Sequence, residues 1–269
     1  NVSKLSYKPE TISTANVEYD VFITGSDQVL NLDLTDSDYN YYLSFAHSTK
    51  KKCGYAVSQG NYDISKNPES ISYLKKIHLL SFRERVAMNA LPNDYRLNST
   101  HVVDPTLLLT KDEWFSIAES IKIPEKFILL YLISPKPHNF SYVKELAKQK
   151  EMPIYYINYT YTMHLGMHNL RYVSPEQFLY LIQKASYIVT NSFHGTTFSV
   201  IFNKQFVSEL SHEKQHANAR INELLIDLDL QDRIDQKKVL HIDNKIDYES
   251  VNRKVAELRK NSINFLKQI

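Results

Sequence analysis

Short apolar runs alternate with amphipathic segments along most of the chain, and this alternation restricts the fold more than any other feature of the sequence. Runs bounded by glycine, proline or small polar residues and rich in branched or aromatic side chains are typical of buried strands. The predicted strands span residues 20–24, 52–57, 79–82, 101–103, 127–133, 153–157, 188–190 and 205–210. The predicted helices span residues 68–80, 86–91, 140–150, 199–202, 219–228 and 249–267, and two more begin after Thr110 and Ser174. Alternating strands and helices predict an α/β fold with parallel sheets.

A proline-containing segment divides this pattern into two. Residues 121–126 include Pro124 and are typical of an interdomain linker, and the alternation starts again after them. A chain of 269 residues is long enough for two modest domains. We therefore expect an amino-terminal domain over residues 1–120, a carboxyl-terminal domain over residues 126–247 and a final helix within residues 248–269. A substrate would bind in a cleft between two such domains.

The stretch from Tyr187 to Ser199 contains the strongest candidate for a functional site. A β-branched strand gives way to small polar residues, and His194 and Gly195 follow before the predicted buried helix. The first amides of a helix attract an anion, and open α/β sheets bind ligands at the carboxyl ends of their strands. Gly195 would let a ligand or another backbone approach closely. His194 can transfer a proton near neutral pH. The pattern is equally consistent with a ring that caps the helix or binds a carbonyl.

A second strand-to-loop transition lies near the start of the chain. The strand that ends at Thr24 is followed by Gly25, Ser26, Asp27 and Gln28. The chain has only five glycines, so we expect each to stand where the backbone requires one.

Composition and charge narrow the classes of partner. The net charge is +2, without a concentrated basic stripe, which argues against nucleic-acid binding. No apolar run is long enough to span a bilayer. Cys53 is the only cysteine, so the chain cannot form an internal disulfide, and this is consistent with a reducing compartment such as the cytoplasm. Because Cys53 lies in a predicted strand, we interpret it as a packing residue. His164 and His168 have helical spacing but no third ligand nearby, so no metal site is predicted.

Four segments stand in an order and spacing that resemble those of the polysaccharide pyruvyl transferase family. They are residues 22–31 (FITGSDQVLN), 81–84 (SFRE), 104–109 (DPTLLL) and 190–196 (TNSFHGT). The resemblance runs from Asp20 to about Arg233 and implies two Rossmann-like domains of the glycosyltransferase-B type, with the last helix returning to the amino-terminal domain. The family's earlier strand-helix segment is missing ahead of residue 20, which suggests a partial chain.

The resemblance implies transfer of a pyruvyl group from phosphoenolpyruvate to a sugar hydroxyl pair, forming a ketal. It makes His194 the catalytic acid, because it matches the motif histidine. The implied donor-binding residues of the carboxyl-terminal, donor-side domain and of the 81–84 motif are Arg83, Asn191, Ser192, Phe193, Gly195, Thr196 and Arg220. The implied acceptor-side residues of the amino-terminal domain are Ser26, Asp27 and Gln28.

Several of these residues have structural alternatives. Arg83 could instead pair with Glu84 or another neighbour, and Arg220 could be a solvated helix charge. Asp27 could cap the next helix. Asp104 favours a turn after a strand over a chemical role.

One position departs from the family pattern. The resemblance implies an arginine two residues before the motif histidine, and Ser192 stands there. Half of the implied phosphate clamp is therefore absent. Arg220, Arg171 or the helix amides after Gly195 could replace it, or the donor could be different.

Two other functions stay open at this point. The same fold could serve a glycosyltransferase that uses a nucleotide-sugar, or a non-catalytic relative that assists glycan assembly. For the transferase, phosphoenolpyruvate is a co-substrate, and no metal or organic cofactor is needed. The expected partners are this small donor and a sugar or lipid-linked glycan, the latter compatible with peripheral membrane association. Neither the acceptor sugar nor the oligomeric state follows from the sequence.

Overall fold

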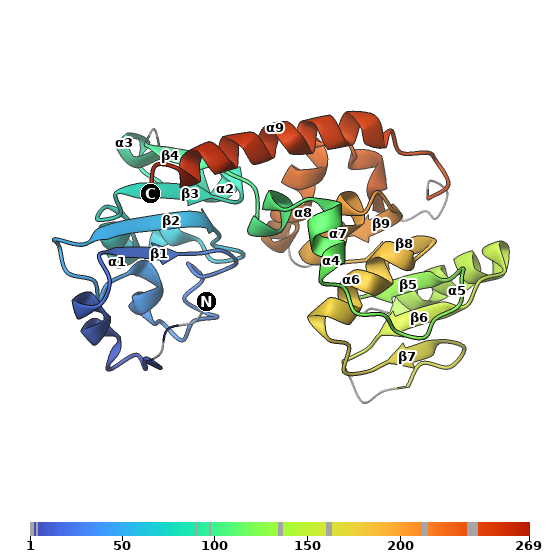
Figure 1. Cartoon of the computed structure of the whole chain (residues 1–269). Coiled ribbons are helices and arrows are strands. Elements are labelled where there is room, and N and C mark those ends of the chain that lie inside the picture. The colour runs from blue at the N-terminus through green and yellow to red at the C-terminus, as the bar shows by residue number, and fades with distance from the viewer. Residues whose placement is uncertain are drawn as a thin grey trace. The chain divides into compact units, whose positions relative to one another are not determined.

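The computed structural model describes residues 3, 5–89, 91–96, 98–133, 137–159, 163–210, 215–235 and 242–269. The chain divides into two compact units, which Figure 1 shows as ribbons. The first unit combines Asn1–Leu108 with Glu257–Ile269, and the second unit is Leu109–Ala256. The division thus follows Leu108, ahead of the proline-containing segment 121–126, and residues 109–120 group with the second unit.

The first unit is built on a parallel sheet of four strands in the order β1-β2-β3-β4. Its strands are β1 (Val21–Thr24), β2 (Lys51–Val57), β3 (Leu79–Phe82) and β4 (Ser99–His101). Its helices are η1 (Ile12–Val17), η2 (Tyr39–Tyr42), η3 (Ile64–Lys66), α1 (Pro68–Leu74), α2 (Arg85–Asn89), α3 (Asn93–Arg96) and η4 (Pro105–Leu108), those named η being of the 3-10 type. Because sequential parallel strands need a crossover, each strand leads into a helical connection before the next one.

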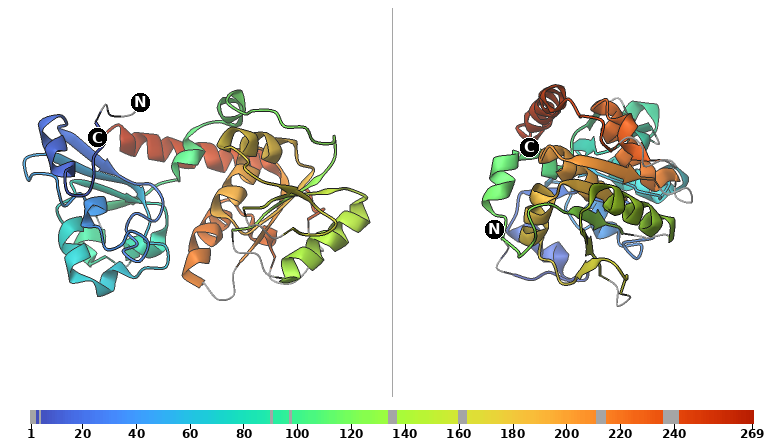
Figure 2. Two further views of the ribbon diagram at one scale, coloured as in Figure 1. Left: turned by 90° about the horizontal axis from the view of Figure 1, so that it is seen from below. Right: turned by 90° about the vertical axis from the view of Figure 1, so that its right-hand side faces the viewer.

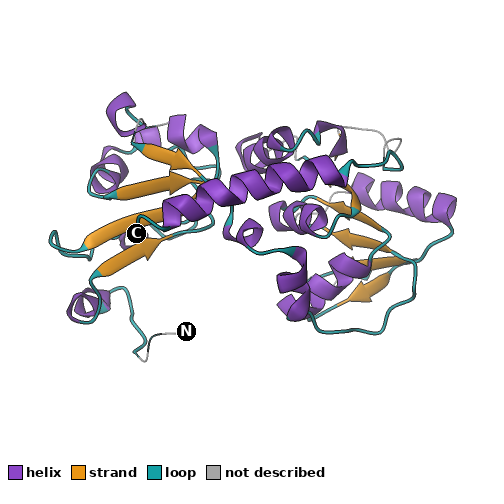
Figure 3. Ribbon diagram, turned by 45° about the horizontal axis from the view of Figure 1, so that its top comes forward, coloured by secondary structure: helices purple, strands orange, loops and turns teal. Residues whose placement is uncertain are grey.

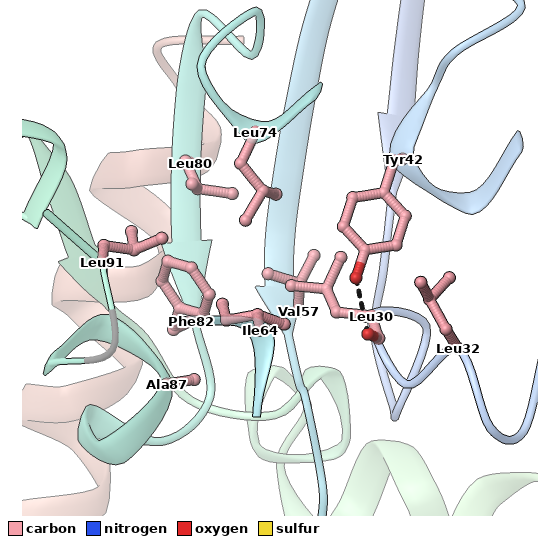
Figure 4. Packing of buried hydrophobic residues seen from close by; sticks show 10 residues of the cluster. All are labelled: Leu30, Leu32, Tyr42, Val57, Ile64, Leu74, Leu80, Phe82, Ala87 and Leu91. Atoms are coloured by element: carbon pink, nitrogen blue, oxygen red, sulfur yellow. Dashed lines mark hydrogen bonds between the residues drawn. The ribbon is translucent and has the colours of Figure 1, made fainter. Parts of the chain in front are cut away.

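One face of this sheet buries the hydrophobic core drawn in Figure 4. Val57, Leu80 and Phe82 from the strands pack there against Leu74 of α1. Tyr42 lies among them, and its hydroxyl donates a hydrogen bond to the Leu30 carbonyl at 2.6 Å. Burying a phenol hydroxyl without a hydrogen-bond partner would cost free energy of folding. The bond avoids that cost and attaches Leu30, in the loop after β1, to the core. Burial also raises the pKa of Tyr42 far above its ordinary value.

The second unit contains a parallel sheet of six strands in the order β10-β9-β8-β5-β6-β7. Its strands are β5 (Ile128–Tyr131), β6 (Ile154–Ile157), β7 (His168–Leu170), β8 (Tyr187–Thr190), β9 (Gln205–Glu209) and β10 (Ile234–Asp235). Its helices are α4 (Lys111–Ser116), α5 (Pro137–Lys150), α6 (Pro175–Lys184), α7 (Phe193–Ile201), α8 (Gln215–Asp227) and η5 (Gln231–Arg233). Figure 2 shows the second sheet from two further directions. The predicted α/β fold with two parallel sheets is confirmed.

Helices cover both faces of the second sheet (Figure 3). Ile128 and Leu130 point to the face where Val143 of α5 packs. Tyr131 points to the other face, where the centroid of its ring lies 5.0 Å from that of the Phe178 ring on α6. Strands that are buried on both faces form continuous apolar runs, which is why β5 lies within the unbroken apolar run of residues 127–133.

The helix starts predicted after Thr110 and Ser174 are confirmed. The Thr110 hydroxyl accepts a hydrogen bond from the amide of Glu113, whose carboxylate bonds back to the Thr110 amide. Ser174 and Gln177 form the same reciprocal pair at the start of α6. Each capping box satisfies amides that a helix leaves unpaired at its amino end.

The long helix α9 (Tyr248–Leu266) begins in the second unit and ends in the first. Its last turns lie against the loop after β4, where the Ser262 hydroxyl accepts a hydrogen bond from the amide of Val103 at 2.9 Å. Arg259 Nε donates to the Leu107 carbonyl at 2.7 Å. Phe265 packs near the ring of Tyr55 on β2. The carboxyl-terminal residues therefore complete the core of the first unit.

Several details differ from the sequence-based prediction. Helix α1 ends at Leu74 and not at residue 80, and α3 was not predicted. Helix α7 begins at Phe193 and not at residue 199, so the polar motif forms its first turns. Strands β7 and β10 were not predicted, because they have three and two residues and no apolar alternation. Strand β4 ends at His101, two residues after it begins, whereas the prediction placed a strand over residues 101–103.

Gly25 stands where the backbone requires glycine. Its φ is +118°, and a Cβ atom there would lie 2.0 Å from the Tyr55 carbonyl oxygen. Gly25→Ala is therefore expected to lower the free energy of unfolding by about 3 kcal/mol or more, as backbone strain adds to overpacking. Gly166→Ala is the matched control, since Gly166 has a φ of +78° but a Cβ atom there would meet no other group within 4 Å. Denaturant unfolding of both variants checks this, and equal losses would show that the contact with Tyr55 contributes nothing.

Candidate active site

The corner between β8 and α7 is fixed by side chains that bind backbone groups. The Thr190 hydroxyl donates to the Tyr131 carbonyl at 2.7 Å and accepts from the Ser192 amide at 3.1 Å. The Ser192 hydroxyl accepts from the Gly195 amide at 3.2 Å and so caps α7. Asn191 Oδ1 accepts from the Ile133 amide at 2.8 Å. The amino end of α7 is thereby held at the carboxyl edge of the sheet.

Gly195 allows α7 to approach β8 closely. A Cβ atom at this position would lie 2.3 Å from Thr190 Oγ1 and 3.1 Å from Tyr131 Cδ1. The sequence suggested that a ligand or another backbone would use this space. In the structure the neighbouring side chain of Thr190 uses it, and a larger residue would separate the helix from the strand.

Thr196 is fully buried and lies between the helix and strand β9. Its hydroxyl donates to the Ser192 carbonyl at 3.0 Å and forms a hydrogen bond with Ser208 Oγ at 2.6 Å. These contacts describe a residue that packs α7 against the sheet, and its contact with a donor stays a prediction.

Phe193 brings the two candidate donor-side groups together. Its ring lies 5.4 Å from the imidazole of His194, edge to face, and the guanidinium of Arg220 on α8 lies 5.6 Å from its centroid. His194 and Arg220 are both half-buried, whereas Phe193 is 8% exposed. An imidazole and a guanidinium thus share one aromatic neighbour at the amino end of a helix, an arrangement suited to an anion that must also receive a proton.

The first unit contains a second group of candidate residues at the carboxyl edge of its sheet. Arg83 follows β3, and its side chain is 1% exposed. Its Nη1 lies 2.6 Å from Asp104 Oδ2, and its Nη2 lies 2.9 Å from Asp27 Oδ1. The Ser26 hydroxyl donates to the same Asp104 oxygen at 3.3 Å. The fold therefore brings Ser26 and Asp27 together with Arg83, which lies far from them in the sequence.

Burial opposes the charge on Arg83, but the carboxylates of Asp104, Glu84 and Asp27 more than offset it and raise the pKa of Arg83. The guanidinium is therefore a permanent cation whose described partners are carboxylates. The ion pair with a neighbour that the sequence left open is present, mainly with Asp104. Binding of a donor by Arg83 stays a prediction.

Asp104 has two roles in this group. Its Oδ1 accepts hydrogen bonds from the amide and the hydroxyl of Thr106, as expected for a residue that fixes a turn. Its Oδ2 binds Arg83, a partner that the sequence did not indicate. The signal for this pairing is that both residues follow neighbouring parallel strands, whose carboxyl ends meet at one edge.

Glu84 is a further site residue that the sequence suggested only as a partner of Arg83. It is 1% exposed and accepts hydrogen bonds from Ser58 Oγ at 2.7 Å and the Gln59 amide at 3.1 Å. It thus ties the end of β3 to the end of β2. The Gln28 side chain lies over Gly60, where a Cβ atom would be 1.7 Å from Gln28 Oε1.

Within the ranges that the structure describes, no three His, Cys, Asp or Glu side chains are grouped so that they could hold a metal ion. His164 stacks on Phe140 at 4.0 Å, and His168 stacks on Tyr155 at 4.6 Å. Among the same described residues, no helix has the length and apolar character that crossing a membrane requires.

Solved structures with a similar fold include UDP-GlcNAc 2-epimerases. The chain superposes on a UDP-GlcNAc 2-epimerase from Methanocaldococcus jannaschii with a TM-score of 0.55 and 13% identity, covering 92% of this chain and 73% of the other. It superposes on a UDP-GlcNAc 2-epimerase from Neisseria meningitidis with a TM-score of 0.52 and 12% identity, covering 100% of this chain and 84% of the other. At these identities the likeness shows the fold alone, which is of the glycosyltransferase-B type.

A comparison of the sequence with protein-family models shows the family of this chain. A comparison with curated proteins gave no match. The family model described as polysaccharide pyruvyl transferase matches residues 1–209, a range that includes all four motifs, the Arg83 group and the corner between β8 and α7. The chain therefore belongs to the polysaccharide pyruvyl transferase family.

Proposed function

We propose that this protein transfers a pyruvyl group from phosphoenolpyruvate to a sugar of a polysaccharide or its precursor and forms a cyclic ketal. The observation that carries the proposal is the group of His194, Phe193 and Arg220 at the amino end of α7. Membership of the family supports the reaction class.

His194 is the proposed general acid. It gives its proton to the methylene carbon of phosphoenolpyruvate, and the former enol carbon becomes an oxocarbenium-like centre. A sugar hydroxyl attacks that carbon and returns a proton to His194. Phosphate then leaves with the electrons of its C–O bond, and a second hydroxyl attacks the resulting oxocarbenium-like carbon, closes the ring and gives its proton to the departing phosphate. An imidazole suits this chemistry because it exchanges protons near neutral pH.

Arg220 is the proposed replacement for the arginine that the family pattern places at Ser192. The hydroxyl of Ser192 caps α7, and its side chain carries no charge. Arg220 lies against Phe193 in the same unit, whereas Arg171 is exposed in the loop between β7 and α6. A guanidinium binds phosphate or carboxylate through paired N–H groups, which makes Arg220 the better candidate.

Arg220→Gln is expected to raise the KM for phosphoenolpyruvate by about tenfold or more, because a charge-assisted hydrogen bond to the donor is lost. The change in kcat should be smaller. Arg253→Gln, at an exposed position of α9, is the control and should leave both constants unchanged. Steady-state kinetics with varied donor concentration gives the answer, and an unchanged KM in Arg220→Gln would remove this residue from the donor site.

The direct test is a screen of sugar acceptors with phosphoenolpyruvate, in which released phosphate and product mass are both measured. Phosphate release that requires the acceptor, with a product heavier by one pyruvylidene group, supports the proposal. Parallel reactions contain a nucleotide-sugar, because the proteins of similar fold include a 2-epimerase solved with UDP-GlcNAc. Release of a nucleoside phosphate in those reactions would favour a glycosyltransferase, and no turnover in any reaction would favour a non-catalytic relative.

A further inference from the structure

A cationic pocket lies at the amino edge of the sheet in the first unit. It has a volume of about 620 Å³ and is lined by residues from the segment before β2, from β2, from the end of α1 and from the segment between α1 and β3. The group of Arg83 and Asp104 follows the carboxyl ends of the strands, so the pocket is separate from that group. All of its lining residues lie in described parts of the chain.

Lys52 is the most unusual residue of this pocket. It is the second residue of β2 and is only 6% exposed. The described residues include no carboxylate within ion-pair distance of its ammonium group. Burial and the neighbouring Lys76 ammonium lower the pKa of Lys52. A buried lysine without a counter-ion is costly in the free protein, and an anion in the pocket would remove that cost.

His78, Lys75 and Lys76 supply further hydrogen-bond donors to the pocket. The His78 Nδ1 accepts a hydrogen bond from the Lys52 amide at 3.1 Å, so the proton of the neutral ring is on Nε2. The His78 amide in turn donates to the Lys52 carbonyl at 2.9 Å, which fixes the ring beside β2. The exposed side chains of Lys75 and Lys76 contribute two more cations to the lining, and Lys76 Nζ lies over the Tyr73 ring at 4.8 Å.

The lining of the pocket carries one sign of charge. The lining residues include three lysines and neither aspartate nor glutamate. The two chain segments that supply the lining, 44–52 and 73–78, contain no acidic residue at all. A concave site with one sign of charge concentrates ions of the opposite sign. The serines at positions 44 and 48 add hydroxyls to the wall.

We propose that this pocket binds a phosphate group attached to a small organic body. Phosphate offers several strong acceptor oxygens, which match the ammonium groups and the His78 Nε2–H. The volume lies within the range of about 300–1,000 Å³ that is typical of small-molecule sites and exceeds the need of a lone phosphate ion. The side chains of Tyr73 and Ile77 supply apolar wall for the organic part. A soluble sugar phosphate and a lipid headgroup share this chemistry.

The test uses the full chain at low ionic strength. Isothermal titration calorimetry with glucose 1-phosphate is expected to detect binding that Lys52→Met weakens by at least about tenfold, since a charged donor is lost while the apolar stem is kept. The double variant Lys75→Gln, Lys76→Gln should weaken it similarly and changes only exposed residues, so it decides the matter if Lys52→Met does not fold. Lys66→Gln is the control: its side chain is 83% exposed and pairs with Asp63 outside the pocket, and it should leave the affinity unchanged.

A second arm distinguishes the two sources of phosphate. Vesicles of phosphatidylglycerol and of phosphatidylcholine are floated with the protein. Co-flotation with the anionic vesicles only, lost in the pocket variants and reduced by glucose 1-phosphate, identifies a lipid headgroup. Calorimetric binding without co-flotation identifies a soluble phosphate ester. Absence of binding in both arms, or binding that the pocket variants do not alter, would refute the proposal whatever the outcome for pyruvyl transfer.

Discussion

His194→Ala is expected to lower acceptor-dependent release of phosphate from phosphoenolpyruvate by at least about 100-fold, the lower end of what general acid catalysis contributes. The imidazole stands in the first turn of α7, half-buried and beside Phe193. Alanine favours helix more than histidine does, so the variant should keep its secondary structure and its melting temperature. Activity would therefore be lost without loss of the fold.

The control for this variant is His47→Ala, which removes an exposed imidazole from the first unit. It should turn over at the rate of the unaltered protein. Circular dichroism and thermal unfolding of both variants establish that they are folded. Should His194→Ala retain near-normal turnover under these conditions, another group must protonate the donor and the proposed mechanism is wrong.

Asp104→Asn is expected to lower the free energy of unfolding by about 3 kcal/mol or more, because removing one partner of a buried ion pair leaves the other charge uncompensated. Arg83 and Asp104 are almost completely buried, with side chains 1% and 3% exposed. Asp104 also accepts a hydrogen bond from Ser26 and fixes the turn at Thr106. Its loss would therefore disturb several groups of the first unit at once.

Asp27→Asn provides the matched comparison, since it makes the same chemical change on the same arginine. Its side chain is 60% exposed, and ion pairs of exposed groups contribute about 1 kcal/mol or less. Asparagine also tolerates the φ of +60° at this position. Urea unfolding of the two variants should give clearly different midpoints. Similar midpoints would mean that burial does not increase the contribution of the Asp104 ion pair to the free energy of unfolding.

The fold was largely predictable because buried parallel strands are continuous apolar runs. The β5 and β8 segments are of this kind, and they form neighbouring parallel strands in the sheet. The start of α7 was misplaced because Phe193 to Thr196 carry small and polar side chains that suit a loop equally well. The cap at Ser192 and the fit of Gly195 against Thr190 decide for a helix. Such tertiary contacts are not visible in local periodicity.

The candidate site residues come from motifs that are visible in the sequence, whereas the contacts between these residues are not visible there. Ser26, Asp27 and Arg83 were identified by motif, yet their connection through Asp104 depends on strand order, which the sequence leaves undetermined. Arg220 and Phe193 likewise meet because α8 packs on α7. The sequence around Lys52 did not predict the cationic pocket, because a lysine at the start of a strand is common and is usually exposed.

Helix α9 has a consequence for how the molecule loses its structure. Its early residues, such as Val251 and Val255, are buried in the second unit, and its late residue Phe265 is buried in the first. Melting of one hydrophobic core would release part of a helix whose remaining turns still belong to the other core. The two cores therefore share a cooperative element, and damage within Glu257–Ile269 would weaken the core that Asn1–Leu108 forms.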